Sequence, residues 1–117
     1  MMIGGNIEAV VQKKIHSTVN QIGENVEVWS DVGTVLGWLD YSTGQNDVNQ
    51  YNAKLQDTTH YFLCDYHVWI RDEGLTAENT RLVIKGQTYD VLLIDDPMEM
   101  HQHLEIYLKY VGGGLGV

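Results

Sequence analysis

The sequence predicts a mainly β protein: a small antiparallel β-barrel of about six strands, with an N-terminal α-helix and a long polar loop. Three observations lead to this prediction. Apolar residues recur at helical spacing over residues 6–23, apolar and polar residues alternate in several segments after residue 25, and residues 42–59 follow neither period. A length of 117 residues suits one hydrophobic core, so residues 1–117 are expected to form a single domain.

The N-terminal helix is predicted over residues 6–23. Apolar side chains recur there at steps of three and four residues, which places them on one stripe of a helix. The stripe consists of Ile7, Val10, Val11, Ile15, Val19 and Ile22. Asn6 is a suitable N-cap and Gly23 a suitable left-handed C-cap, so both ends of the segment favour a helix boundary.

The barrel is predicted over residues 25–111, where the period changes to two. The expected strands are residues 25–30, 33–41, 61–70, 101–111 and the two halves of a hairpin over residues 81–95. The hairpin should turn at Gly86. Gly37 lies inside a predicted strand, where a glycine usually marks a bulge or a sharp bend. Closure of the sheet would leave no exposed strand edges.

Two segments are predicted to lie outside the regular structure. Residues 42–59 are dense in Asn, Gln, Asp and Thr, and a polar loop of this length is uncommon in so small a domain. Such loops are usually functional or disordered, so this one is a candidate functional segment. The C-terminal residues 112–117, with the sequence GGGLGV, are expected to form a flexible tail.

The charge of the chain argues against a nucleic-acid-binding protein. Seven Lys and Arg residues stand against 16 Asp and Glu residues, which gives a net charge of −9. Proteins that bind nucleic acid draw most of their non-specific affinity from Lys and Arg on phosphates. The only adjacent basic pair here is Lys13-Lys14, so a polyanion should be repelled at long range.

The cellular setting is expected to be the cytoplasm. The start of the chain lacks the basic and apolar regions of a secretory signal, and no apolar run approaches the roughly 20 residues needed to span a bilayer. The single cysteine, Cys64, excludes an internal disulfide and suits a reducing compartment. Its apolar neighbours predict a buried core thiol.

A candidate metal site is the run of His101, His103 and Glu105, which would share one face of a strand. The glycines and the later Glu of a cupin-type site are missing, and the other histidines show no related spacing. The pattern therefore favours a strand with one buried and one solvated face, so neither a metal nor a cofactor is predicted. A small metal-dependent enzyme using these three residues is the alternative hypothesis.

Other catalytic patterns are weaker still. The chain has no G-x-S-x-G elbow, no glycine-rich phosphate loop before a helix and no C-x-x-C pair. Asp95 and Asp96 could be imagined as an acid and a base, but adjacent carboxylates beside Pro97 are more typical of turn residues that bond the local backbone. The sequence therefore predicts a protein without catalytic residues rather than an enzyme.

Three segments, in this order and spacing, resemble a known family. They are GWLDYSTG (37–44), AKLQDTTHYFL (53–63) and IKGQTYDVLLIDDPMEMHQHLEIYLKYV (84–111). They are similar to the head-closure proteins of tailed bacteriophages, and the match as a whole covers roughly residues 25–111. These proteins, also called head–tail joining or stopper proteins, occur in prophages as well.

The resemblance implies a structural protein of the virion that resides in the host cytoplasm before assembly. Such a protein is a small β-barrel that forms a ring below the portal and its adaptor, closes the DNA exit channel and offers the surface on which the tail docks. The implied partners are further copies of the chain, a portal-adaptor protein and a tail-completion protein, without any membrane. DNA would pass through the channel without specific binding. Two alternatives stay open: a tail-completion protein, and a barrel interaction module unrelated to phages.

The resemblance also implies a role for the predicted loop, because this loop faces the channel in the family. In this chain it corresponds to residues 42–59. The candidate channel-loop residues are Gln45, Asp47, Asn49, Gln50, Tyr51 and Lys54.

Overall fold

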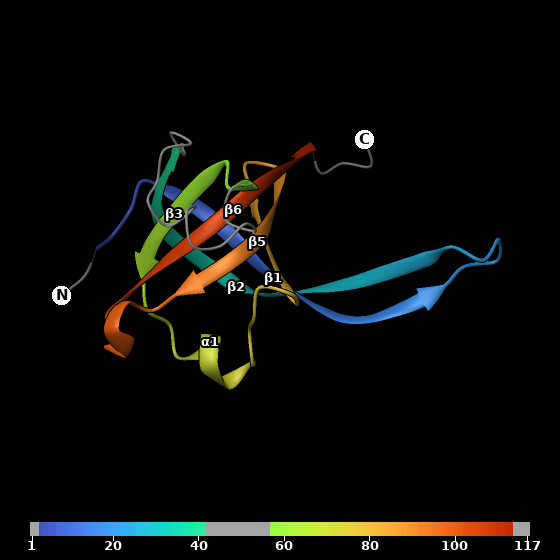
Figure 1. Ribbon diagram of the computed structural model, residues 1–117, viewed down its shortest axis with the longest axis horizontal. Helices are drawn as coiled ribbons and strands as arrows, with labels where there is room; N and C mark the ends of the chain where they lie inside the picture. The colour runs from blue at the N-terminus through green and yellow to red at the C-terminus, as the bar shows by residue number, and fades with distance from the viewer. Residues whose placement is uncertain (1–2, 42–56, 114–117) are drawn as a thin grey trace.

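The computed structural model describes residues 3–41 and 57–113, and within them it contains six strands and one short α-helix (Figure 1). In chain order these are β1 (Ile7–Val19), β2 (Asn25–Tyr41), β3 (His60–Asp65), α1 (Trp69–Asp72), β4 (Thr80–Ile84), β5 (Gln87–Asp95) and β6 (His103–Gly113). A single 3-10 turn, Pro97–Glu99, connects the last two strands.

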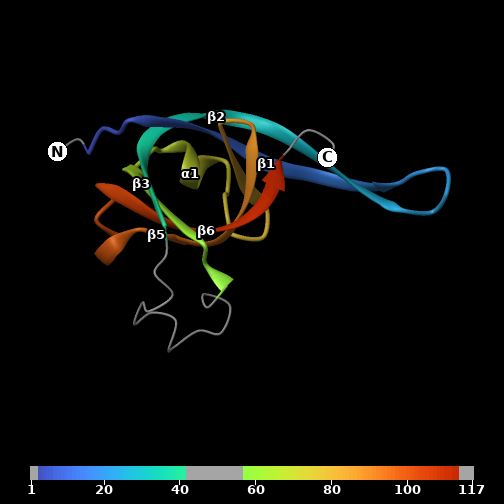
Figure 2. The same cartoon turned by 90° about the horizontal axis from the view of Figure 1, so that it is seen from above.

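All strand pairs are antiparallel, and the sheet closes into a barrel in the order β1-β2-β3-β6-β5-β4. The view in Figure 2 shows the strands curving around one central core. The prediction of a mainly β protein with about six antiparallel strands is therefore confirmed. The predicted hairpin is also confirmed, because β4 and β5 pair directly and turn at Lys85 and Gly86, which both have positive φ.

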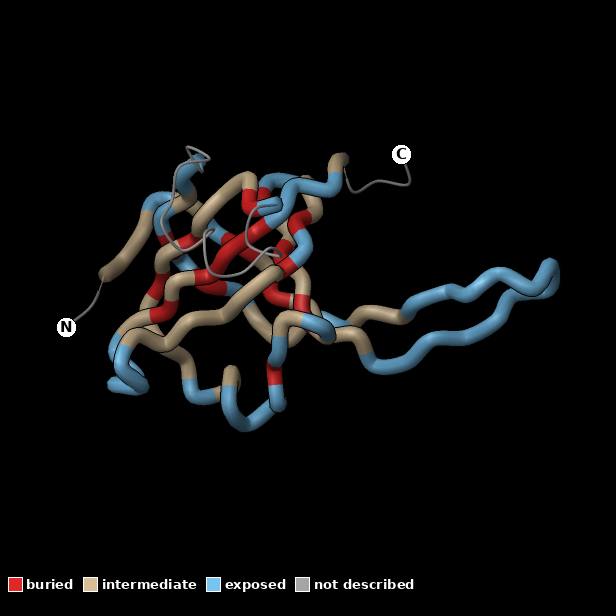
Figure 3. Tube along the Cα trace, viewed as in Figure 1, coloured by how far each residue is buried: buried red, intermediate tan, exposed pale blue. Residues whose placement is uncertain are grey.

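The core lies inside the closed sheet, where buried and less buried residues alternate most clearly along β3 and β4 (Figure 3). The largest fully buried side chains are Phe62, Leu82, Ile84, Leu104, Leu108 and Cys64. Cys64 is thus the buried thiol that the sequence predicted, and burial raises its pKa to about 12. Such a thiol remains protonated at neutral pH and is a poor nucleophile.

The predicted N-terminal helix over residues 6–23 is wrong, because residues 7–19 form β1 instead. In the barrel, β1 alternates in the usual way, with Ala9 and Val11 in the core. A bulge at Ile15 then shifts the alternation by one residue. The misleading helical pattern has a simpler source: Ile7, Val11, Ile15 and Val19 are four residues apart, a spacing that fits one face of a strand as well as one face of a helix. The many β-branched residues of the segment favour the strand.

The outer halves of β1 and β2 form a two-stranded ribbon that leaves the barrel, and we call residues 14–31 the arm (Figure 1). β1 pairs with β4 only over Ala9–Lys13, whereas its pairing with β2 continues to Val19. A register shift on each strand, at Ile15 and at Val32, marks the root of the arm. The arm makes the molecule elongated, with extents of 48 × 30 × 24 Å.

Gly23 occupies the turn at the tip of the arm rather than the end of a helix. Its φ of 86° lies in the left-handed region that glycine adopts readily. Asn20 organises the turn, because its side-chain Oδ1 accepts hydrogen bonds from the backbone N–H of Ile22 at 3.1 Å and of Glu24 at 2.9 Å. The same glycine that suggested a helix C-cap therefore closes a β-hairpin.

Further boundaries differ from those predicted. Residues 25–30 and 33–41 belong to one strand, β2, and the strand predicted over 61–70 ends at Asp65 before α1. The last strand begins at His103 and includes Gly112 and Gly113, so these two residues of the predicted tail are part of the sheet. The rest of the tail, 114–117, and most of the predicted loop, 42–56, lie outside the described residues.

Gly37 allows a close approach of two backbone segments rather than a bulge. It pairs with Ile7 without a register shift, and its carbonyl accepts a hydrogen bond from the N–H of Asn6 at 3.1 Å. A Cβ atom on Gly37 would lie 2.5 Å from the carbonyl oxygen of Leu63 and 2.5 Å from the Phe62 ring. A Cβ on Gly5 would in turn lie 2.2 Å from the nitrogen of Gly37. The N-terminal segment can cross β2 here only because both residues are glycines.

Candidate interaction surfaces

The structure separates the two histidines of the candidate metal site. His101 precedes β6 and has a φ of 56°, so it does not share a strand face with His103. Its Nδ1 pairs with the carboxylate of Asp96, and its ring stacks on Tyr66 at a centroid distance of 4.7 Å. His103 instead lies 3.4 Å from the carboxylate of Glu105, measured from Nε2 to Oε2.

Each imidazole therefore has its own carboxylate partner. Among residues 3–41 and 57–113, no group of three or more His, Cys, Asp or Glu side chains is arranged to hold a metal ion. Asp96 behaves as the turn residue that the sequence suggested, because its Oδ1 also accepts a hydrogen bond from the backbone N–H of His101 at 3.0 Å. The geometry gives no support to the alternative hypothesis of a metal-dependent enzyme.

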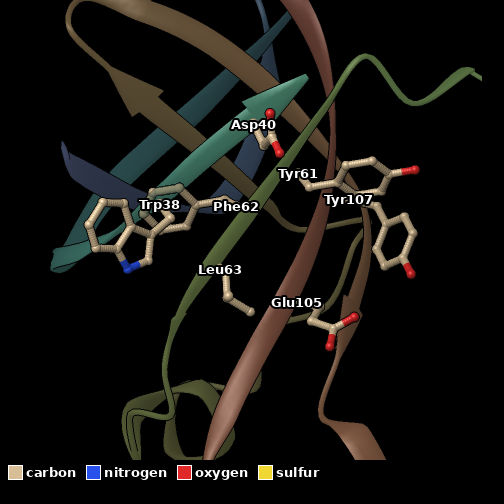
Figure 4. Close-up of a pocket in the computed structure, with 7 residues that line it drawn as sticks. All are labelled: Trp38, Asp40, Tyr61, Phe62, Leu63, Glu105 and Tyr107. Atoms are coloured by element: carbon tan, nitrogen blue, oxygen red, sulfur yellow. The ribbon is translucent and has the colours of Figure 1, made fainter. Parts of the chain in front are cut away.

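An open groove of about 350 Å³ lies on the outside of the barrel, across β2, β3 and β6 (Figure 4). We call it the outer groove, and its lining residues are Trp38, Asp40, Tyr61, Phe62, Leu63, Glu105 and Tyr107. Most of this lining is aromatic or aliphatic. An exposed apolar surface with a polar rim is typical of a site that contacts another protein.

Tyr61 and Tyr107 form part of the wall of the outer groove, and Asp40 and Glu105 are the carboxylates that line it. Tyr61 and Tyr107 are paired across β3 and β6 with their rings edge to face at 5.0 Å (Figure 4). Tyr107 is only 6% exposed, and burial, together with the nearby Glu105 and Asp95, raises the pKa of its hydroxyl. Burial also raises the pKa of Asp95, with Glu105 and Asp96 adding to the effect and His103 opposing it. The groove thus combines an apolar wall with negative charge.

A cluster of aromatic rings closes one end of the barrel, where residues 42–59 connect β2 to β3. We call Tyr41, His60, Tyr89 and Tyr110 the mouth cluster. The His60 ring lies 4.7 Å from Tyr41 and 5.1 Å from Tyr89, and Tyr89 lies 5.5 Å from Tyr110. Burial lowers the pKa of His60 and raises that of Tyr89. These rings cover the core at the end from which the connection departs.

The end of the connection is fixed to the barrel just before His60. The Thr59 hydroxyl accepts a hydrogen bond from the N–H of Tyr110 at 2.7 Å, and the N–H of Thr59 donates to the carbonyl of Leu108 at 2.8 Å. Thr58 is buried as well, although its hydroxyl has no partner among the described residues. The predicted channel-loop residues Gln45, Asp47, Asn49, Gln50, Tyr51 and Lys54 all lie outside the described residues.

The arm is a further surface that sequence reasoning missed. Every residue from 15 to 27 is exposed (Figure 3), including apolar side chains such as Val19 at 66% and Ile22 at 78% exposure. A two-stranded hairpin alone is only marginally stable in water. The β-branched content of residues 7–19 could have indicated a strand, but no local signal shows where a strand leaves its sheet.

Comparison with known proteins agrees with the fold and the sequence motifs. A family model described as phage head completion protein matches residues 6–109. The solved solution structure of protein SF1141 from Shigella flexneri 2a has a similar fold, with a TM-score of 0.61. The alignment covers 92% of this chain and 94% of that one, at 16% sequence identity. No curated protein matches the chain. In the described residues, no helix is long and apolar enough to cross a membrane.

Proposed function

Because the chain belongs to the phage head completion protein family, we propose that it is a structural subunit of the virion at the head-to-tail interface. In this proposal, copies of the chain form a ring below the portal and its adaptor. The ring closes the DNA exit channel after packaging and presents the surface on which the tail docks. The match to the family over residues 6–109 carries the proposal.

The way in which residues 42–59 join the barrel supports a role as a channel loop. The connection leaves β2 at Tyr41 and returns at His60, and these two residues are direct partners in the β2–β3 ladder. Both ends of the connection are therefore anchored side by side at one end of the barrel. A segment held at a single place can project into a channel while the barrel keeps its position in a ring.

The charge of the chain supports the proposed passage of DNA. A channel through which DNA moves should not retain phosphates, and the net charge of −9 opposes such retention. Of the basic residues, Lys14 and Arg81 already face the ring of Trp29, with Arg81 at 4.3 Å from the centroid. A structural subunit of this kind also requires no catalytic group.

The proposal is tested by deleting the gene from its phage or prophage and examining induced lysates by electron microscopy. We expect separate heads and tails, with DNA missing or leaking from the heads, and rescue by the wild-type gene on a plasmid. Complete particles that retain their DNA would contradict the proposal. Heads that retain DNA beside incomplete tails would instead support the alternative of a tail-completion protein.

The loop is tested separately in the rescue assay. Residues 43–56 are replaced by a Gly/Ser segment of equal length, which removes the side chains of Gln45, Asp47, Asn49, Gln50, Tyr51 and Lys54. We expect heads that still bind tails but lose DNA before the tail is attached. The matched control is Lys85→Ser with Asp90→Ser, two exposed positions in the β4–β5 hairpin, which should rescue fully. Normal DNA retention by the loop variant would remove the channel role from this segment.

A further inference from the structure

The arm has a strand edge on each side without a neighbour in the described residues. The outer edge of β1 is covered by β4 as far as Lys13, and the N–H of Lys14 still donates to the carbonyl of Asn79 at 2.8 Å. From Ile15 to Val19, that edge has no further pairing. On the other side, β3 covers β2 only from Gly37 onward. Such edges are ready to pair with another strand.

The two strands of the arm carry opposite charges. Over residues 13–19, β1 contains Lys13, Lys14 and His16 and no acidic residue. Over residues 25–31, β2 contains Glu27 and Asp31 and no basic residue. Pairing between two β1 edges, or between two β2 edges, would bring like charges together. Pairing between the β1 edge of one arm and the β2 edge of another would bring opposite charges together.

We propose that the arms of neighbouring copies pair side by side, the β1 edge of each copy with the β2 edge of the next, to form a continuous antiparallel sheet. This inference rests on the proposed ring, whose self-contacts it assigns to residues 14–31. β1 runs toward the tip of the arm and β2 runs back, so arms that point the same way meet as antiparallel strands. The two edges differ, and the contact is therefore of the head-to-tail kind that closes rings.

The register within the arm shows how the side chains meet. Lys14 is the direct partner of Trp29, and Glu27 and Asp31 lie two residues to either side of Trp29 on the same face of β2. In a ring whose arms stand at equal height, the free β1 edge from His16 to Val19 adjoins residues 25–28 of the next copy, and Lys14 lies just before the start of this contact. Within one copy, Lys14 already pairs with Glu27 at 3.1 Å, so the contact extends a row of alternating charges.

Pairing also provides the third strand that the arm lacks. The exposed apolar residues Val19 and Val26 lie near the tip, and a neighbouring strand on each side would cover part of their surface. A sheet of many strands is more stable than one isolated hairpin. Contacts around a closed ring reinforce one another, so each can be weak in the free protein.

The proposal is tested by disulfide cross-linking of full-length variants that each carry one added cysteine. Ser17→Cys places a thiol on the β1 edge and Glu27→Cys places one on the β2 edge, at residues that are direct partners within one arm. Mixing the two variants allows a disulfide only between copies. We expect a mixture, at high protein concentration and in assembled particles, to form covalent dimers at least tenfold faster than either variant alone. Cys64 remains in place because it is buried.

The matched control is a mixture of Asp90→Cys and Lys109→Cys. These exposed residues are also direct cross-strand partners, but they lie between β5 and β6, where both strands have two neighbours. Equal cross-linking of the control would contradict the proposal, as would self-linking of either arm variant at the rate of the mixture. Particles that contain the protein without the arm cross-link would overturn the arm contact and leave the proposed function intact. Particles that never contain the protein would instead overturn the proposed function.

Discussion

At Gly37, a single additional methyl group would conflict with the packing of the fold. The N-terminal segment crosses β2 at Gly37, and the Phe62 ring and the backbone of Leu63 occupy the space next to it. The crossing also brings the N–H of Ile3 within 2.6 Å of the Asp65 carboxylate, on the far side of the strand pair. Tight packing of this kind leaves no room for a methyl group.

The substitution Gly37→Ala should therefore destabilise the protein. Its Cβ would lie 2.5 Å from backbone and ring atoms, and we expect a loss of roughly 1–3 kcal/mol in the free energy of unfolding. The matched control is Gly33→Ala on the same strand, whose Cβ would meet only the Trp69 ring at 3.8 Å. Urea denaturation of both variants measures the difference, and equal stabilities would show that the crossing can move apart.

Replacement by valine should have different effects on stability at the two adjacent threonines that end the connection. Thr59→Val leaves the N–H of Tyr110 without its acceptor and should cost about 1 kcal/mol. Thr58→Val removes a buried hydroxyl that has no partner in the described residues, so stability should stay constant or rise by up to about 1 kcal/mol. Thermal denaturation of both variants is the measurement. A loss at Thr58 as large as that at Thr59 would mean that its hydroxyl is hydrogen-bonded.

Among the elements, the arm differs from the barrel because its stability does not come from the core. Its residues from 15 to 27 are all exposed, whereas Ala9 and Val11 of the same strand are buried. The first half of β1 thus contributes to the core, and its second half forms part of the exposed arm. The barrel closes without the outer half, since the pairing with β4 ends at Lys13.

Shortening the arm should leave the barrel folded. Residues 15–28 can be replaced by Asn-Gly, which joins the paired residues Lys14 and Trp29 by a two-residue hairpin turn. Since the removed side chains are exposed or half-buried, we expect the free energy of unfolding to change by less than about 1 kcal/mol. Chemical denaturation followed by tryptophan fluorescence measures the change. Loss of cooperative unfolding would show that the arm is needed for the barrel itself.

The elements that could be predicted from sequence are those whose signals are local. The β4–β5 hairpin has two apolar runs around Gly86, and β6 has strict alternation from Leu104 to Leu108. β1 was missed because the four-residue spacing of Ile7, Val11, Ile15 and Val19 fits a helix as well as a strand, and because its partner β4 lies far away in sequence. The mouth cluster and the outer groove were missed for a related reason. Their residues meet only through the register of strands that are distant in the chain.

At the scale of the whole molecule, the surfaces to which we assign functions lie on separate parts of an elongated, negatively charged protein. The barrel carries the outer groove on one side and the mouth cluster at one end, and the arm extends along the longest dimension of 48 Å (Figure 1). A net charge of −9 is spread over this surface. The described residues thus offer several separate faces to neighbours, and the negative net charge disfavours the approach of a polyanion.

The protein should accordingly leave duplex DNA unbound. We expect no retardation of a short duplex in a native gel at 50 mM salt, because few basic residues are available to displace counterions from phosphates. The control is a variant with Asp31→Lys, Asp90→Lys and Glu99→Lys, exposed positions where the added charge should produce weak, salt-sensitive retardation. Retardation by the wild-type protein that persists at 200 mM salt would point to a specific DNA site.

β2 connects the arm to the start of residues 42–59 through one continuous strand. It is a single strand of 17 residues that runs from Asn25, beside the tip of the arm, to Tyr41, where residues 42–59 begin. At about 3.3 Å per residue, the contour length of this strand is roughly 55 Å, more than the 48 Å length of the molecule because the strand curves in the barrel wall. Tension applied to the arm is therefore transmitted along one covalent backbone, through the barrel wall, to the origin of the connection. In the proposed ring, β2 links the arm contact of each subunit to the origin of residues 42–59.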